Sequence, residues 1–157
     1  MNSIDIMEKI VAKFTKSKIT LAVAESCTGG YISNMITNIP GASKVFERGI
    51  ICYSNLSKIH LLNINPEDLV QYGAVSEIVA KHLANNIRIL SNVTIGIGVT
   101  GIAGPTGGTP EKPVGLVYIG FSTQKEIIVK KYQFSVDRIT FKEKVLKEIL
   151  TLLQNFR

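Results

Sequence analysis

Hydrophobic residues follow two different spacings along this chain, in alternating segments, and the order of these segments is compatible with few folds. Apolar residues recur every three or four positions in some segments, which is typical of amphipathic helices, and every second position or without a break in others, which is typical of strands. The segment 93–99 is the clearest strand, because Val93, Ile95, Ile97 and Val99 alternate with smaller residues. Since both kinds of segment interleave throughout, the sequence predicts an α/β fold, a three-layer α/β/α sandwich on a mixed sheet.

The first and last residues of each periodic segment give the expected bounds of the strands and helices. Strands are predicted at 19–24, 49–54, 93–99, 114–122 and 127–134. Helices are predicted near residues 4–14, from Gly30 to about Asn38, from Asn65-Pro66, from Ser76 and over about 141–156. We find no internal repeat and no linker rich in Pro, Gly and Ser, so residues 1–157 are expected to form a single domain.

The composition excludes several classes of protein. Hydrophobic residues make up 45% and charged residues 19%, which is typical of globular proteins and not of disordered chains. No apolar run approaches the ~20 residues that cross a bilayer. The N-terminus lacks the charged start and continuous apolar stretch of a signal peptide. We therefore expect a cytoplasmic protein that does not bind membranes, with Cys27 and Cys52 as free thiols.

The formal net charge of +6 favours anionic partners, such as phosphorylated metabolites, nucleic acid or an acidic surface. The basic residues form no dense tract, which favours a solvated basic surface. The chain has no Trp, and its Phe and Tyr residues are dispersed, so it lacks the basic, aromatic-rich face of a nucleic-acid binder. We expect a small-molecule partner and no stable nucleic-acid partner.

One candidate for chemistry is Ala24-Glu25-Ser26-Cys27-Thr28-Gly29-Gly30, at a predicted strand-to-helix turn. A serine there can project its hydroxyl into a crevice, while backbone N–H groups at the helix start face the same space and suit a phosphate or an oxyanion. The structural alternative is a helix-capping serine or threonine followed by a glycine pair that serves packing.

A second candidate is Tyr53-Ser54-Asn55-Leu56-Ser57-Lys58. If a helix starts at Asn55, Lys58 lies one turn inside it and can fold back toward the strand end that carries Tyr53. A lysine acts as a general base when burial or nearby positive charge lowers its pKa toward neutrality. The alternative is a solvent-exposed lysine and a core tyrosine.

The third candidate is the glycine-rich loop over 101–113, whose glycines would let the backbone approach a ligand closely. The alternative is a flexible hairpin connection. The string at 96–101 matches GxGxxG, but it lies within a strand pattern and opens no helix, so we do not interpret it as a dinucleotide site.

The chain lacks the residues of several well-known catalytic and metal sites. The two histidines, His60 and His82, both lie in predicted helices, which argues against a Ser-His-Asp triad. The chain has no HExxH, no CxxC and no run of carboxylates at metal-ligand spacing, so we expect no metal site and no cofactor. Cys27 could be a rival nucleophile at a helix start, but no histidine is near it in sequence, and Ser26 is preferred.

Four motifs together resemble the C-terminal domain of CinA proteins. They are AESCTGG at 24–30, the FERG…YSN…K run at 46–58, GAVSE at 73–77 and TGIAGPTGGTPEKPVG at 100–115. This domain also occurs alone as the nicotinamide-nucleotide amidase, and the chain resembles that standalone form over nearly its whole length. Larger CinA proteins add an N-terminal domain with pyrophosphatase-type activity, which we expect to be absent here together with that activity.

The resemblance implies a catalytic serine–lysine pair assisted by a tyrosine, and by motif these are Ser26, Lys58 and Tyr53. The residues expected near the substrate are Cys27, Thr28, Gly29, Gly30, Arg48, Thr100, Gly101, Gly104 and Arg138. The chain departs from the family at Val136, which precedes Asp137-Arg138 where the family usually has glycine. A valine cannot adopt a positive φ cheaply, so the placement of Arg138 is left open.

The activity implied by the resemblance is hydrolysis of nicotinamide mononucleotide to nicotinic acid mononucleotide and ammonia, by a protein that forms homo-oligomers. An alternative is a catalytically weak nucleotide-binding protein associated with DNA uptake or damage response, since fold does not imply function. The intact Ser26, Tyr53 and Lys58 set favours the enzyme, because a pure binder has no chemical reason to hold it.

Overall fold

A computed structural model describes residues 1–157 and contains one five-stranded sheet with the strand order β2-β1-β3-β4-β5. The strands are β1 (Leu21–Glu25), β2 (Phe46–Ile51), β3 (Ile95–Gly101), β4 (Leu116–Ser122) and β5 (Ile127–Gln133). The first three run parallel, and β4 and β5 continue the sheet in antiparallel fashion as a hairpin. The sheet is therefore mixed, with β2 and β5 at its edges.

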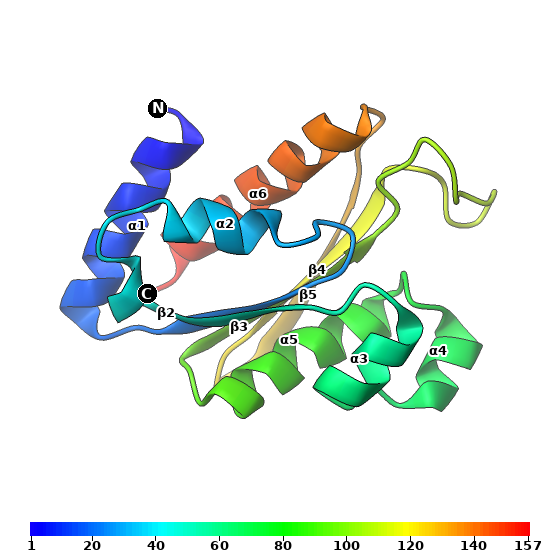
Figure 1. The fold of residues 1–157 in the computed structure, drawn as a ribbon, viewed down its shortest axis with the longest axis horizontal. Helices are drawn as coiled ribbons and strands as arrows, with labels where there is room; N and C mark the ends of the chain where they lie inside the picture. The colour runs from blue at the N-terminus through cyan, green and yellow to red at the C-terminus, as the bar shows by residue number, and fades with distance from the viewer.

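Helices cover both faces of this sheet (Figure 1). One face carries α1 (Ser3–Ser17), α2 (Tyr31–Thr37) and α6 (Arg138–Asn155), and the other carries α3 (Asn55–Leu62), α4 (Pro66–Tyr72) and α5 (Glu77–Ser91). A short 3₁₀ helix, η1 (Ala42–Lys44), precedes β2. The three-layer sandwich on a mixed sheet, predicted from the sequence, is confirmed.

The two helical layers bury separate cores against the sheet. The larger core has 25 buried residues and includes Phe14 of α1 and Phe141 of α6, both fully buried. The smaller has 10 buried residues and includes Val79 and Leu83 of α5. In both layers the helices use apolar stripes at three- and four-residue spacing, which is why the hydrophobic periods locate the helices.

Some strand ends differ from the expected ones. The strand predicted at 49–54 begins earlier, at Phe46, and ends at Ile51. The Cys52 N–H still donates to the Glu25 carbonyl oxygen (2.8 Å), and Ser54 then caps α3. The fourth strand begins at Leu116 rather than at residue 114, since Gly115 has a positive φ of 92° that breaks the extended run.

Helix α5 lies unusually close to the sheet because small residues face it. A Cβ added to Gly98 would lie 2.5 Å from the Ala84 nitrogen, and one added to Gly96 would lie 2.1 Å from the Ala84 oxygen. Both distances are shorter than van der Waals contact. The first two glycines of the GxGxxG-like string, Gly96 and Gly98, therefore serve helix–sheet packing within β3.

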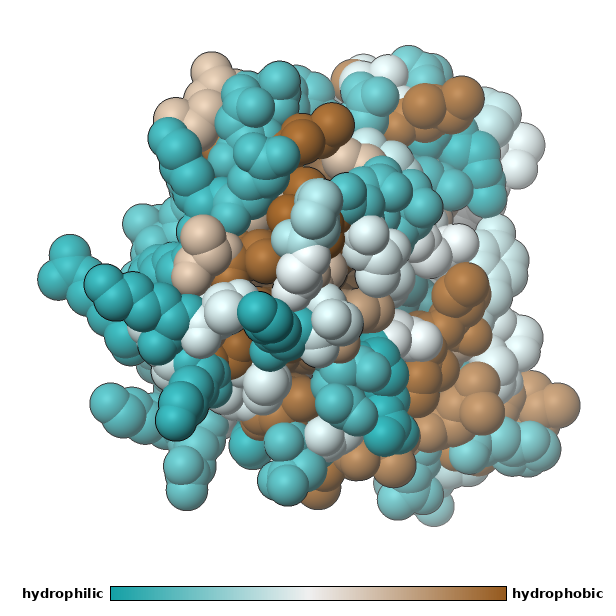
Figure 2. Space-filling model, turned by 60° about the vertical axis from the view of Figure 1, so that its left-hand side comes forward, coloured by the Kyte–Doolittle hydropathy of each residue, from teal (hydrophilic) through white to brown (hydrophobic).

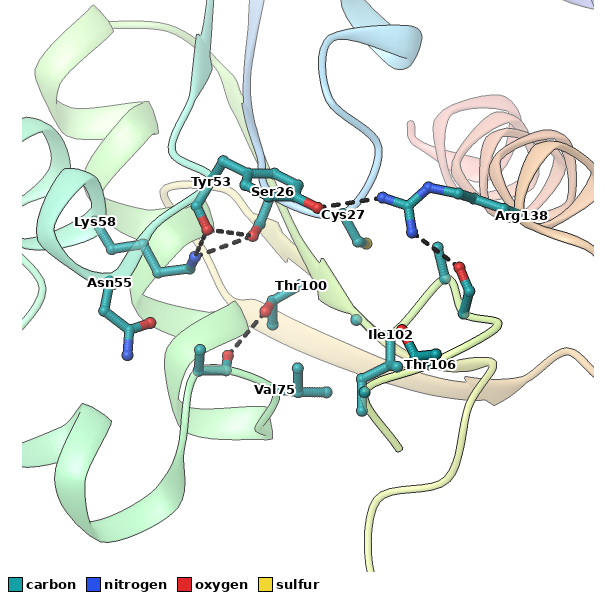
Figure 3. A pocket seen from close by; sticks show the side chains of 15 residues that line it. Ser26, Cys27, Tyr53, Asn55, Lys58, Val75, Thr100, Ile102, Thr106 and Arg138 are labelled. Atoms are coloured by element: carbon teal, nitrogen blue, oxygen red, sulfur yellow. Dashed lines mark hydrogen bonds between the residues drawn. The ribbon is translucent and has the colours of Figure 1, made fainter. Parts of the chain in front are cut away.

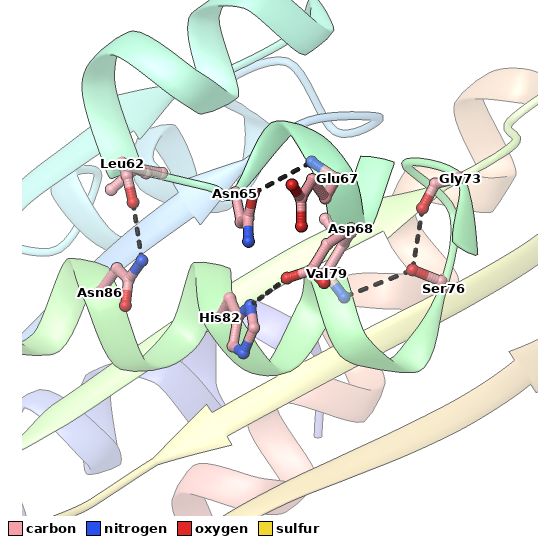
Figure 4. A network of polar contacts seen from close by, with 9 residues as sticks. All are labelled: Leu62, Asn65, Glu67, Asp68, Gly73, Ser76, Val79, His82 and Asn86. Carbon is pink, nitrogen blue, oxygen red and sulfur yellow. Dashed lines mark hydrogen bonds and ion pairs between the residues drawn. The ribbon is translucent and has the colours of Figure 1, made fainter. Parts of the chain in front are cut away.

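Polar contacts fix α3 and α4 on α5 (Figure 4). Asn86 donates from Nδ2 to the Leu62 carbonyl oxygen (2.7 Å), and His82 Nδ1 lies 3.2 Å from Asp68 Oδ2. Ser76 caps α5 and donates to the Gly73 carbonyl oxygen (2.9 Å). These contacts hold the segment between α4 and α5 in place beside the carboxyl end of β3.

Hydrophilic side chains predominate on the face drawn in Figure 2, and hydrophobic ones gather mainly toward its lower right. None of the helices combines the length and apolar character that crossing a bilayer requires.

The close approach of α5 predicts that Gly98→Ala destabilises the fold. The added methyl group meets helix backbone that cannot move aside, so we expect a loss of about 1–3 kcal/mol in the free energy of unfolding, measured by urea denaturation. Ser91→Ala on the same helix is the control. Its buried hydroxyl has no hydrogen-bond partner, so its removal should not destabilise the protein. A Gly98→Ala midpoint equal to that of the parent would contradict the packing argument.

Candidate active site

A pocket of about 270 Å³ opens where the parallel strands β1 and β3 end (Figure 3). Its walls come from the turn after β1, the start of α3, the segment before α5, the glycine-rich loop after β3 and the first residue of α6. The carboxyl ends of parallel strands are the usual position of ligand sites in open α/β sheets. The three segments singled out in the sequence therefore meet at one place.

Ser26 follows β1 directly and is fixed by its backbone. Its N–H donates to the Val99 carbonyl oxygen (3.1 Å), which continues the pairing of β1 with β3 by one residue. The side chain is buried, with only 7% of the residue exposed, and its Oγ lies 2.9 Å from Lys58 Nζ. A serine hydroxyl is thus held beside a lysine amine inside the pocket.

The carboxylate of Glu25, the residue before Ser26, organises the turn. It accepts hydrogen bonds from the N–H groups of Gly30 (2.9 Å), Ile32 (3.2 Å) and Ser33 (2.7 Å). It also accepts from the hydroxyls of Thr28 (2.7 Å) and Ser33 (2.8 Å), and Glu25 is wholly buried. The N–H groups at the start of α2 are therefore occupied by the protein's own carboxylate.

Two N–H groups of the turn remain free. Those of Cys27 and Thr28 donate to no other residue, whereas the Gly29 N–H donates to the Ser26 carbonyl oxygen (3.1 Å). Cys27 also lines the pocket. The residue after a nucleophile often supplies an oxyanion donor, so Cys27 N–H is the best-placed candidate for that role.

Lys58 lies in the first turns of α3 and is almost wholly buried, with 1% of the residue exposed. Its Nζ lies 2.9 Å from Ser26 Oγ and donates to the carbonyl oxygens of Cys52 and Tyr53, each also at 2.9 Å. No carboxylate forms an ion pair with it. Burial lowers the pKa of Lys58 from its ordinary value, which favours the neutral amine.

The neutral amine fits this geometry well. An uncharged Nζ has two N–H groups and one lone pair, and the two carbonyl oxygens take the N–H groups. The lone pair is then left to accept the Ser26 hydroxyl proton. The site can therefore move a proton from serine to lysine without a histidine.

Tyr53 contributes to the site at two points. Its carbonyl oxygen binds Lys58, while its phenol oxygen accepts from Arg138 Nη2 (3.2 Å) and lies away from the amine (Figure 3). Arg138 also donates from Nη1 to the Gly104 carbonyl oxygen (2.9 Å), so it joins α6 to the glycine-rich loop. Val136 has no positive φ, and Arg138 lines the pocket despite the valine before it.

The remaining expected residues divide into two groups. Thr100, Gly101 and Gly104 line the pocket, and the Thr100 hydroxyl donates to the Ala74 carbonyl oxygen (2.8 Å). The residues that do not line it are Thr28, Gly29, Gly30 and Arg48. Thr28 and Gly30 bind Glu25 instead, and Arg48 lies on the edge strand β2, 3.9 Å from the Glu47 carboxylate.

Two parts of the site were not predicted from the sequence: Glu25, and the wall formed by Ala74 and Val75. A signal for Glu25 existed, because it is the one charged residue at the end of an otherwise apolar strand. The wall residues belong to GAVSE, but small apolar side chains carry no chemical signal of their own. They form part of the pocket wall.

The cysteines are poor nucleophiles in this setting. Both are free and buried, and burial raises the pKa of Cys27 to about 12 and that of Cys52 to about 11. A thiol that stays protonated at neutral pH reacts slowly. No group of three or more His, Cys, Asp or Glu side chains is arranged to hold a metal ion.

Comparison with known proteins identifies close relatives. The model of the CinA C-terminal domain matches residues 3–156. A Thermoanaerobacter sp. (strain X514) protein, provisionally named a competence-damage inducible protein, is 49% identical over 151 residues. A CinA-like protein of Kosmotoga olearia is 49% identical over 131 residues. These matches cover 96% and 83% of this chain but only 37% and 32% of the relatives, so the chain spans about a third of their length.

Two crystal structures share the fold. The competence/damage inducible protein CihA from Agrobacterium tumefaciens has a TM-score of 0.94 and 33% identity, with 98% of this chain and 94% of that chain covered. The competence damage-inducible protein A (ComA) from Klebsiella pneumoniae has a TM-score of 0.94 and 26% identity, with 99% and 97% covered. Each resembles this chain over almost its whole length.

The raised pKa values predict inert thiols in the folded protein. At pH 8 a disulfide reagent such as Ellman's should react with Cys27 and Cys52 on the order of 100-fold or more slowly than in the urea-unfolded chain, because little thiolate is present and both groups are buried. The absorbance of the released thiol gives both rates. Reaction of one thiol in the native protein at the unfolded rate would show an activated cysteine and would favour Cys27 as nucleophile.

Proposed function

This chain belongs to the CinA C-terminal domain family, and from that premise we propose that it is an amidohydrolase converting nicotinamide mononucleotide and water to nicotinic acid mononucleotide and ammonia. The observation that carries the proposal is the 2.9 Å contact between Ser26 Oγ and the buried Nζ of Lys58. Keeping a lysine buried without a carboxylate partner is costly, and a binding protein gains nothing from it.

In the acylation step, neutral Lys58 accepts the Ser26 hydroxyl proton as Oγ attacks the carboxamide carbon. The negative charge that develops on the carboxamide oxygen is stabilised by the free N–H of Cys27. One such donor is typically worth about 3–4 kcal/mol in the transition state. The C–N bond then breaks, Lys58 returns its proton to the departing nitrogen as ammonia, and the acyl group stays on Ser26 as an ester.

In the deacylation step, water is the nucleophile and Ser26 Oγ is the leaving group. Lys58, again neutral, removes a proton from a water molecule that attacks the ester carbon. The ester C–O bond breaks and Ser26 Oγ regains its proton from Lys58. The product is the carboxylate of nicotinic acid mononucleotide, and the Ser26–Lys58 pair is restored.

The surrounding residues support the pair in this scheme. The carbonyl oxygens of Cys52 and Tyr53 hold the two N–H groups of Lys58, so the orientation of the amine depends on the backbone rather than on a titrating side chain. The Tyr53 ring and Arg138 form one side of the pocket, with Val75 opposite (Figure 3). We propose that the pyridine ring occupies the space between them.

Replacing the nucleophile tests the proposal directly. Ser26→Ala should lower ammonia release from nicotinamide mononucleotide on the order of 10⁴-fold or more, because the covalent step is lost, while the melting temperature stays close to that of the parent. Cys27→Ala, one residue away, is the matched control and should keep most of the activity, since its backbone N–H is retained. Near-parental turnover by Ser26→Ala would rule out the serine mechanism. A parent that binds the nucleotide and releases no ammonia would instead favour the weak-binder alternative.

The role of Lys58 predicts the pH dependence. The neutral amine is the active form, so the rate should rise with pH as Lys58 loses its proton and should level off below the ~10.4 of a free lysine. Lys58→Arg keeps the positive charge but cannot act as a base, and should lose about 10²–10⁴-fold in kcat. Substantial turnover by Lys58→Arg would leave Lys58 only an electrostatic role, even if Ser26 proved essential.

A further inference from the structure

Two cations lie one turn apart at the start of α6. Arg138 and Lys142 are four residues apart in the helix, so their side chains share a face. Arg138 lines the pocket. The Lys142 Nζ lies 3.7 Å from the point that a Cβ on Gly29 would occupy, which places the ammonium group over the turn that follows Ser26.

Neither cation is neutralised by a carboxylate. The ion pairs of the structure involve Glu47 and Asp68, and both lie elsewhere. Asp137, next to Arg138, caps α6: its carboxylate accepts from the N–H groups of Ile139 and Thr140 and from the Thr140 hydroxyl. Glu143, next to Lys142, forms no ion pair. Lys142 is also half-buried, so part of its hydration is lost without a partner in the protein.

The start of α2 is closed to an anion. Its N–H groups are bound by the Glu25 carboxylate, and a phosphate placed there would meet a buried negative charge and no free donor. The cations nearest to the turn after Ser26 lie on its other side, where Lys142 approaches Gly29 and Arg138 lines the pocket.

We propose that Lys142, together with Arg138, holds the phosphate of the nucleotide at the mouth of the pocket, above Gly29, while the carboxamide lies at Ser26. This inference rests on the proposed function. Arg138 can bind the phosphate because its contacts with Gly104 and Tyr53 use two of the five guanidinium N–H groups and leave three for an anion. The Tyr53 side chain reaches from the Ser26–Lys58 pair to Arg138, a span that the ribose would cross (Figure 3).

The test is Lys142→Met, which keeps the aliphatic stem and removes the charge. The KM for nicotinamide mononucleotide should rise about tenfold or more, with kcat little changed, because a charge-assisted contact to a remote group is lost. The parameters for the riboside, which has no phosphate, should not change. Lys142→Arg should restore most of the affinity. Lys144→Met, an exposed lysine of the same helix, removes the same charge and should leave both substrates within about twofold of the parent.

A binding measurement separates this inference from the catalytic proposal. In the Ser26→Ala protein, titration with inorganic phosphate should shift the amide NMR signal of Gly29, and Lys142→Met should weaken that binding about tenfold or more. This result supports the subsite even if no pyridine nucleotide is hydrolysed by the parent. Hydrolysis of the mononucleotide with a parental KM in Lys142→Met, an equal loss on both substrates, or phosphate binding insensitive to Lys142 would each overturn it.

Discussion

Glu25 ends the inner strand β1 with a fully buried carboxylate that forms no ion pair, and the geometry of the pocket depends on how that charge is satisfied. Burying an isolated charge is costly. Here three backbone N–H groups and two hydroxyls bind it, and the start of α2 presents the positive end of its helix dipole. The turn that carries Ser26 therefore has a fixed shape before any ligand enters.

The same arrangement keeps Glu25 and Lys58 chemically apart although both are buried at one strand end. A carboxylate paired with Lys58 would stabilise the ammonium form and would raise its pKa. Because Glu25 is bound to the amides of α2, no carboxylate opposes the lowering of the Lys58 pKa by burial. Two buried ionisable groups thus have separate partners, and this separation favours the neutral form of the lysine.

The fold could be predicted from the sequence because hydrophobic periods locate the helices and strands. The residue pattern placed Ser26 and Lys58 near strand ends, and the resemblance to the CinA C-terminal domain implied that they form a pair. The sequence does not show which acceptor binds the N–H groups after Ser26. A glycine pair at a helix start has the same pattern whether the amides bind a ligand or an internal carboxylate, so Gly29 and Gly30 were expected at the substrate. Arg48 was expected there too, but it lies on an edge strand, and edge position is set by pairing that periodicity does not encode.

The two edge strands of the sheet affect the tendency of the protein to self-associate at high concentration. Unpaired strand edges are templates for intermolecular β-pairing, and charged side chains along them oppose it. Here β2 exposes Glu47 and Arg48, and β5 exposes Lys130 and Lys131. The net charge of +6 adds long-range repulsion, so both edges of the sheet carry features that oppose intermolecular strand pairing. The charges that oppose self-association therefore lie on the edge strands, and the residues that line the pocket do not have to supply them.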